Sequence, residues 1–546
     1  MNKRRAFTIC LKIAAILCAL AGNFRVDAAP STPAAPLASV KSPMKALRQK
    51  AAERPRRLLF NNDGGDATRK IAEPTVQALL DSRTTPLVGT QVDSLFYCTK
   101  TVGLDLMTYF TKIGTVFTNR EDIFASNQME ELVAKGIDPL RVMVDFGKKH
   151  NIEVFWSLRM NDNHDATRTV PYGEIMFREN RFKTAHPEYM LGSLTKRPKH
   201  GAWTALNYAL PEVRERVFRL VEEVCRNYDV DGVELDFFRH PVCFEATTRG
   251  EPVTDKERAL MTELLTRIRR MADEVGQSRG RPILIAVRTP DSVDYCCAIG
   301  FDLERWMAGD LIDLYMPAGY FQLNDWDYSV ALGHKYGVKV YPSLDETRIK
   351  NEPGKAMRMT DLAFRGRAAD VWGTGADGVY LFNFPDYYKS DASMLQEMGS
   401  SKTLAPLDKD YFGSVRGLGI ASGGNLPYDR YVKLETLNPD NPRTINPGET
   451  KSAKLSLGDD GEKAASARNT LRLQLVGVES PEHVRVTLNR HALKMAADSE
   501  EWLEAPADPS NLHKGRNVVE VALADEASKP VRWADVVLQV RHADLK

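Results

Sequence analysis

Short apolar runs recur between residues 57 and 384 and alternate with segments of helical periodicity. Eight runs have the length and composition of strands buried on both faces, and most are bounded by Gly or Pro. They cover residues 57–61, 92–97, 152–158, 232–237, 283–288, 311–316, 338–342 and 378–384. Eight such strands separated by helices predict an α/β fold, a (β/α)8 TIM barrel over residues 57–404. A doubly wound sheet is the competing fold, but no Gly-rich phosphate loop follows the first strand.

The hydrophobic pattern changes beyond about residue 405. Strict alternation of apolar and polar side chains marks four segments, residues 471–475, 484–488, 519–523 and 536–540. A period of two with one polar face is typical of an antiparallel sheet with one solvated side. We therefore predict a C-terminal antiparallel β-sandwich over residues 450–546, joined to the barrel by a connecting segment at 405–449.

The first 28 residues have the layout of a secretory signal peptide. A basic start precedes an apolar run, whose uninterrupted part at 13–22 is too short to span a membrane. Small residues at 26–28 then provide a cleavage site. We predict a signal peptide at 1–28, a flexible leader at 29–56, and a periplasmic or secreted protein without stable membrane insertion after cleavage. An uncleaved membrane anchor is the alternative.

The composition is that of an ordinary globular protein, with 43% apolar and 27% charged residues. These values exclude a mainly disordered chain and a polytopic membrane protein. The 74 basic and 73 acidic residues leave a formal net charge of +1. This balance predicts no nucleic-acid partner.

Carboxylates at the carboxyl ends of the predicted strands are the candidates for catalysis, because barrel enzymes collect their active residues there. Glu234 and Asp236 lie two residues apart on the fourth strand, so both point into the barrel. Asp236 is the first catalytic candidate and Glu234 a supporting residue; the alternative is a buried Asp–Arg network that only orients loops. Glu346, after the seventh strand, supplies the second carboxyl group for glycosidic cleavage, with Asp345 as the weaker choice. The alternative is that this pair forms an exposed turn or a helix cap.

Other polar side chains at strand ends and in the loop at 160–203 are expected to contact a substrate. They are Arg159, Asn161, Asp162 and His164 after the third strand, Trp203 in the loop, Arg288 and Asp291 after the fifth strand, and Tyr320 and Asn383. Asp291 is also the reserve general acid. His164 and its neighbouring aspartates suggest a metal, but no second histidine has ligand spacing, so neither a metal nor a cofactor is predicted. Eight basic against five acidic side chains between residues 159 and 203 favour an anionic glycan.

Several motifs within residues 57–390 resemble the family 10-like glycosyl hydrolases of bacteria, which are related to the domain of unknown function 187 group. These motifs are RMNDNHD at 159–165, HPEY at 186–189, WTALN at 203–207, PEVR at 211–214 and YDVDGVELDFFRHP at 228–241. The resemblance implies a retaining-type carbohydrate-active barrel with an accessory β-domain, in which Asp236 matches the family's acidic residue on strand four. Phe238 and Arg239 occupy the stretch where the family usually has a glutamate.

These features predict an exported glycoside hydrolase that acts on a polysaccharide or oligosaccharide through two carboxyl groups. The first alternative is a non-catalytic glycan-binding barrel of the cell envelope. The second alternative is a structural envelope protein.

Overall fold

The computed structural model describes residues 43–99, 102–166, 180–384, 392–416, 426–459 and 467–542. The predicted signal peptide and residues 29–42 of the predicted leader lie outside these ranges. Within the described residues, no helix combines the length and the apolarity that crossing a membrane requires.

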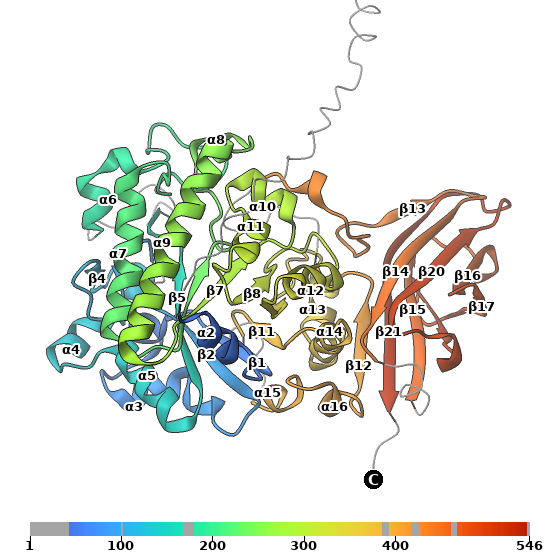
Figure 1. Ribbon diagram of the computed structural model, residues 1–546. Helices are drawn as coiled ribbons and strands as arrows, with labels where there is room; N and C mark the ends of the chain where they lie inside the picture. Colours follow the sequence, from blue (N-terminus) through green and yellow to red (C-terminus); the bar gives the residue numbers. More distant parts are fainter. Residues whose placement is uncertain are drawn as a thin grey trace, which may run out of the picture. The chain divides into compact units, whose positions relative to one another are not determined.

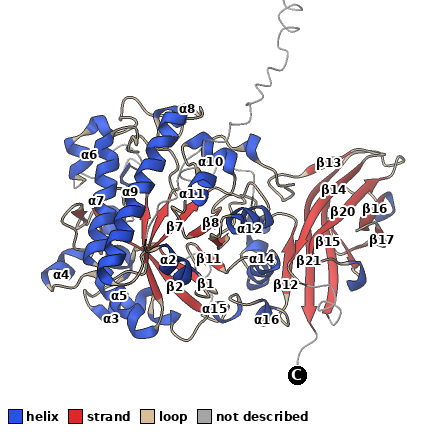
Figure 2. Cartoon of the chain, viewed as in Figure 1, coloured by secondary structure: helices blue, strands red, loops and turns tan. Residues whose placement is uncertain are grey.

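Nine strand segments form one parallel sheet in the order β10-β11-β1-β2-β5-β6-β7-β8-β9, with helices packed around it (Figures 1 and 2). The segments are β1 Leu58–Asn62, β2 Val92–Cys98, β5 Glu153–Arg159, β6 Gly232–Asp236, β7 Leu284–Thr289, β8 Leu314–Pro317, β9 Lys339–Val340, β10 Ser343–Leu344 and β11 Val379–Leu381. Only Tyr341 and Pro342 separate β9 from β10, so the two edges of the sheet are halves of one strand and the sheet closes into an eight-stranded barrel. The predicted fold is confirmed, since every predicted run overlaps one of these strands.

The barrel strands are connected through helices, as the alternating pattern predicts. The helices are α3 Val76–Arg83, α4 Met129–Ala134, α5 Pro139–His150, α6 Arg181–Ala185, α7 Pro211–Asn227, α8 Glu245–Arg249, α9 Asp255–Arg279, α10 Val293–Ile299, α11 Leu303–Ala308, α12 Trp326–Lys335, α13 Glu352–Arg358, α14 Asp361–Gly373, α15 Met394–Glu397 and α16 Ser401–Leu404. Helix α7 begins with a proline and buries one apolar stripe that includes Val213, Val217 and Val221. It runs beside α9, whose Arg267 forms an ion pair with Glu215 of α7 (Figure 1).

The end of the predicted flexible leader is a helix. Helix α2, Lys45–Ala52, places the fully buried Arg48 among three carboxylates, one on α9 and two between α11 and β8. The guanidinium lies 2.7 Å from both Asp310 and Asp313 and 3.2 Å from Asp273. Three acidic partners make burial of one arginine tolerable, and this network explains why the chain is ordered here although its composition resembles a linker.

The C-terminal part of the chain forms two antiparallel sheets with alternating burial. One sheet has the order β12-β21-β15-β19-β18, with β13 also pairing with β21, and the other has the order β14-β20-β16-β17. Their strands are β12 Lys409–Phe412, β13 Arg443–Ile445, β14 Thr450–Leu457, β15 Ala467–Val476, β16 Val484–Leu488, β17 His491–Leu493, β18 Ala496–Ala497, β19 Trp502–Pro506, β20 Gly515–Leu523 and β21 Val531–His542. The segment at 405–449, which we predicted only to connect the two domains, therefore contributes two strands, β12 and β13, to the first sheet. A separate short pair, β3 Leu106–Met107 with β4 Thr115–Val116, belongs to the barrel part.

The barrel and the sandwich belong to one compact unit and share a buried ion pair. Arg358 of α13 donates two hydrogen bonds of 2.8 Å to the carboxylate of Asp535 on β21, and neither side chain is exposed. Helix α14 approaches β12 so closely that a Cβ at Gly366 would lie 2.2 Å from the carbonyl oxygen of Asp410. Only glycine permits this contact.

Candidate functional site

Asp236 is held in place at the carboxyl end of β6 by the neighbouring strand. Arg288 stands opposite it in the β6–β7 register and donates hydrogen bonds of 3.1 and 2.8 Å to its two carboxylate oxygens. The backbone N–H groups of Phe238 and Arg239 donate to the same carboxylate at 3.0 and 3.2 Å. With four donors and only 3% exposure, Asp236 is a fixed, ionised carboxylate.

Glu234 lies deeper in the barrel and is fully buried. Tyr380 of β11 donates a 2.7 Å hydrogen bond to its Oε1. Burial, followed by the charge of Asp236, raises the pKa of Glu234 to about 7, which is far above the ordinary value of a carboxyl group. The two inward carboxyl groups of β6 therefore have different surroundings. Asp236 is paired with a guanidinium group, whereas Glu234 lies in the buried interior, which favours its neutral form.

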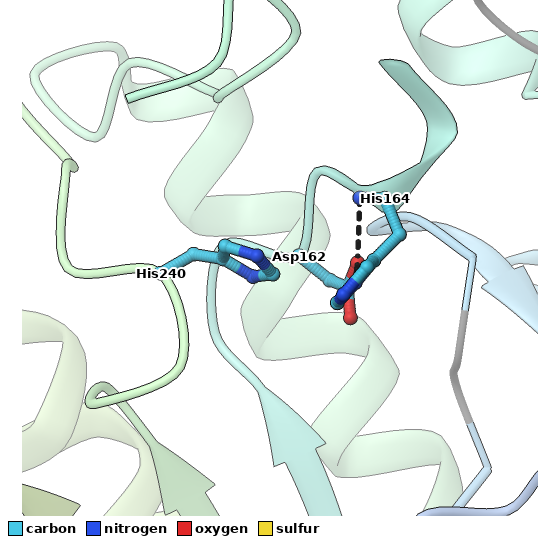
Figure 3. A group of neighbouring side chains, drawn as sticks. All are labelled: Asp162, His164 and His240. Carbon is cyan, nitrogen blue, oxygen red and sulfur yellow. Dashed lines mark hydrogen bonds and ion pairs between the residues drawn. The ribbon is translucent and has the colours of Figure 1, made fainter. Parts of the chain in front are cut away.

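Asp162, His164 and Arg239 form a chain of hydrogen bonds over the barrel mouth (Figure 3 shows the first two residues with His240). The Nδ1 atom of His164 lies 2.7 Å from the Oδ1 atom of Asp162, and Nη2 of Arg239 lies 2.9 Å from Nε2 of His164. Arginine can only donate, so Nε2 must accept and Nδ1 must carry the proton that Asp162 accepts. Burial lowers the pKa of His164 to about 4, so the ring is neutral in this arrangement.

His240 completes a trio with the residue types of a two-histidine, one-carboxylate metal site. Suitable atoms of Asp162, His164 and His240 all lie within 4.8 Å of one another, and all three residues are buried. The hydrogen bonds of His164 nevertheless oppose a metal. An ion at Nε2 would displace Arg239, and an ion at Nδ1 would leave a protonated Nε2 facing the donor of Arg239. The charges of Arg239 and Arg159 also act on this histidine, so the trio fits an Asp–His–Arg chain better than a cation site.

Tyr320 joins the two sides of the barrel mouth through its ring and its hydroxyl. The guanidinium carbon of Arg239 lies 5.0 Å from the ring centre and that of Arg348 lies 3.7 Å from it. Asn383, after β11, donates a 2.9 Å hydrogen bond to the hydroxyl group. Arg348 also forms a 2.9 Å ion pair with Glu346. Cation–π contacts thus bring the Arg239 and Glu346 segments to one place.

Asp345 and Glu346 are adjacent in sequence but have different surroundings. Asp345 is buried and bonded to Arg416, with Arg367 at 4.0 Å from its carboxylate. Glu346 is less buried, and burial raises its pKa. The alternative of an exposed turn does not hold for Asp345, whose carboxylate pairs with Arg416, four residues after the end of β12. A raised pKa is a property that a general acid requires.

Two predicted substrate contacts, Asn161 and Trp203, are largely taken up by contacts within the protein. The amide of Asn161 donates to the carbonyl groups of Leu206 and Val242 at 2.9 and 2.7 Å and accepts from the N–H of Leu206 at 2.9 Å. These bonds tie three loops together. Trp203 is only 8% exposed, which leaves little ring surface for a sugar.

Asp291, the reserve acid, accepts hydrogen bonds from the backbone N–H groups of Leu323 and Asn324 at 2.9–3.1 Å. Burial raises its pKa to about 6. Arg159 is buried between strand ends, where Cys98, followed by the charges of Asp162 and Asp63, raises its pKa. Burial opposes this increase. Two further sequence candidates for contact with a sugar, Tyr172 in the loop at 160–203 and the segment 385–388 after the eighth strand, fall outside the described residues.

Residues 113–246 match the family model described as Glycosyl hydrolase-like 10. The sequence resemblance is confirmed over this segment. It contains Asp236, Glu234 and the whole Asp162–His164–Arg239 chain. No curated protein matches the sequence.

Solved structures with a similar fold include three glycosidases. An alpha-L-fucosidase isoenzyme 2 from Paenibacillus thiaminolyticus is 13% identical over 63% of this chain and 48% of that chain, with a TM-score of 0.39. The catalytic domain of psychrophilic chitinase B from Arthrobacter TAD20 is 11% identical over 65% and 96%, with a TM-score of 0.38. The PgaB (BpsB) glycoside hydrolase domain from Bordetella bronchiseptica is 12% identical over 63% and 99%, with a TM-score of 0.37. This chain spans about half of the fucosidase's length, and such distant likenesses carry no argument about substrate.

Proposed function

We propose that the protein is a glycoside hydrolase whose catalytic carboxyl groups are Asp236 and Glu346. The observation that carries the proposal is their difference in environment at one barrel mouth. Asp236 is an ionised carboxylate with four donors, while burial raises the pKa of Glu346. Cleavage of a glycosidic bond needs one carboxyl group of each kind.

In this proposal Glu346 acts in its protonated form and gives its proton to the glycosidic oxygen as the bond to the anomeric carbon breaks. A water molecule then forms the new bond to that carbon and returns a proton to Glu346. Asp236 supplies a fixed negative charge to the oxocarbenium-like transition state, and Arg288 keeps that charge oriented. Glu234 is a positioning residue beneath Asp236. Its neutral form avoids repulsion between two carboxylates on one strand.

The substrate in this proposal is an acidic glycan. Arg239 and Arg348 both contact the Tyr320 ring at the barrel mouth, and Arg348 also lies 2.9 Å from the carboxyl group of Glu346. Guanidinium groups bind carboxylates through paired hydrogen bonds, so a sugar acid would find donors beside the reacting bond. The signal-peptide pattern supports action outside the cytoplasm, in the periplasm or the medium.

A non-catalytic glycan-binding barrel is the second candidate, and one observation favours it. Phe238 occupies the stretch where the resembled family has a glutamate, and its ring packs against Tyr320 and Phe321. No carboxyl group can act from that position. The second candidate predicts glycan binding without product.

Release of reducing ends from a panel of acidic and neutral polysaccharides tests the proposal. Wild-type protein should release sugar from an acidic polymer, and Glu346→Gln should not. Binding to the same polymer without release by the wild type would replace the hydrolase with the binding barrel. Preference for neutral polymers would contradict the acidic substrate but not hydrolysis.

A further inference from the structure

We propose that a cavity between the barrel and the sandwich is a second binding site, which takes a carboxylate-bearing oligosaccharide. The cavity has a volume of about 520 Å³, within the range of ligand pockets. Its wall includes the start of α12, the end of α14 and the sandwich strands β12, β14 and β20. The site does not depend on hydrolysis at the barrel mouth, because none of the proposed catalytic residues lines it.

Five cationic side chains line the cavity, and two of them form ion pairs with acids that also line it. Lys454 is paired with Asp325 at 2.6 Å, and Arg516 is paired with Glu435 at 3.2 Å. Lys514 lies next to this second pair and is exposed. Lys514 therefore offers a donor to an anionic ligand beside the paired Arg516.

The opposite wall carries two arginines that share one carboxylate. Arg367 and Arg416 both line the cavity, and both have Asp345 as their acidic partner. Burial and the nearby charge of Arg416 lower the pKa of Arg367 to about 9. Two guanidinium groups that share one carboxylate leave one positive charge without a negative partner. A ligand carboxylate would provide that partner.

Two further acidic side chains, Asp370 and Asp327, line the cavity. Burial, followed by the charge of Asp459, raises the pKa of Asp370, which favours its neutral form. A neutral acid can donate a hydrogen bond to a sugar hydroxyl or carboxylate. Asp327 is exposed at the start of α12, where water screens its charge.

Aromatic side chains give the cavity a second feature of glycan sites. Trp326 and Phe412 both line it, from the barrel and the sandwich respectively. Trp326 is half-buried and so keeps part of its ring available, whereas Phe412 is held beneath the guanidinium of Arg358 at 4.4 Å. A half-buried indole beside charged donors suits the apolar face of a sugar ring that also bears an acid group.

Calorimetric titration of the full chain with tetragalacturonate and with a hyaluronan tetrasaccharide tests the proposal. Chitotetraose serves as the neutral probe. The double variant Lys514→Ala/Arg516→Ala should weaken binding of an acidic tetrasaccharide at the cavity by at least about tenfold. The matched control is Arg485→Ala/Lys494→Ala, which removes two exposed charges from sandwich residues outside the cavity lining.

Binding at the barrel mouth is separated by a third variant. Arg348→Gln should remove a mouth site and leave the cavity site, so the two variants should abolish different binding events. Equal affinity of the Lys514→Ala/Arg516→Ala variant and the control for both acidic probes would overturn the proposal. Absence of acidic binding, or equal binding of chitotetraose, would also overturn it. Loss of hydrolysis in Glu346→Gln with cavity binding intact would show that the two proposals stand separately.

Discussion

Arg288 and Asp236 face each other on adjacent barrel strands and form a bidentate ion pair with hydrogen bonds of 3.1 and 2.8 Å. The side chain of Arg288 is 0% exposed and that of Asp236 is 3% exposed. The pair keeps a carboxylate ionised inside a barrel whose neighbouring Glu234 retains its proton. Folding stability and the proposed catalytic role are therefore coupled at this position, because removing either charge leaves the other buried without an ion-pair partner.

The substitution Asp236→Asn is expected to lower turnover by orders of magnitude and to lower the free energy of unfolding by about 3–5 kcal/mol. Both effects follow from loss of the carboxylate that Arg288 neutralises. Urea denaturation and an assay of sugar release measure them on one sample. The double variant Asp236→Leu/Arg288→Met should recover much of the stability without activity. Turnover near that of the wild type in Asp236→Asn would remove Asp236 from the mechanism.

Glu346→Gln is expected to abolish sugar release with a change in unfolding free energy of less than about 1 kcal/mol, because Glu346 has only a partly exposed ion pair with Arg348. In the wild type, kcat/KM should fall as pH rises through the raised pKa of Glu346, since the general acid must be protonated. The matched control is Glu352→Gln on the exposed start of α13. An unchanged pH–rate profile in Glu346→Gln would assign the proton to another group.

Glu234 should make the protein less stable as pH rises from about 4.5 to about 7. Its pKa is raised in the folded state, so this stabilisation is complete below the ordinary pKa and is lost as pH passes the folded value, by about 3 kcal/mol. Glu234→Gln keeps the acceptor for Tyr380 but cannot titrate. The difference in unfolding free energy between this variant and the wild type should therefore shift in favour of the variant between pH 4.5 and 7. A constant difference across that window would contradict the raised pKa.

His164 should remain a neutral ring with its proton on Nδ1 between pH 6 and pH 8. Burial lowers its pKa to about 4, and Arg239 requires an acceptor at Nε2. Nitrogen-15 chemical shifts of the histidine rings report both the charge and the tautomer. Zinc added in slight excess should leave these shifts unchanged, and His150, on the outer helix α5, provides a reference ring. A zinc-induced shift at both His164 and His240 would establish a metal site instead.

The barrel is expected to depend on the sandwich for stability through the ion pair between Arg358 and Asp535. Asp535→Ala should lower the unfolding free energy by about 3–5 kcal/mol, because it strands the buried guanidinium of Arg358. Arg358→Met/Asp535→Leu should restore most of this loss. Thermal denaturation compares these variants, with Asp498→Ala on the exposed side of the sandwich as the control. If all variants melt together, the two parts do not stabilise each other through this pair.

Much of the barrel is predictable from sequence, because strands buried on both faces appear as short apolar runs that end at Gly or Pro. The strand-end positions of Asp236 and Arg288 follow from the same pattern. Contacts between side chains of different strand ends do not follow from this pattern. Asp162 and His240, for example, come from different loops, and no sequence spacing relates them. The helix at Arg48 is equally hidden, because its stability comes from three distant aspartates rather than from its own composition.

The interruption of strand seven by Tyr341 and Pro342 gives the barrel a seam. Lys339 and Val340 pair with β8, and Ser343 and Leu344 pair with β11. The interruption itself keeps two backbone hydrogen bonds, from Tyr341 N–H to Tyr315 and from Tyr380 N–H to Pro342. Because these ladders are shorter than the five-residue β5–β6 pairing, we expect their amides to exchange with deuterium first. Glu346 follows directly after this seam. The proposed proton donor therefore follows a strand with two-residue ladders, whereas Asp236 ends a strand that pairs over five residues with both β5 and β7.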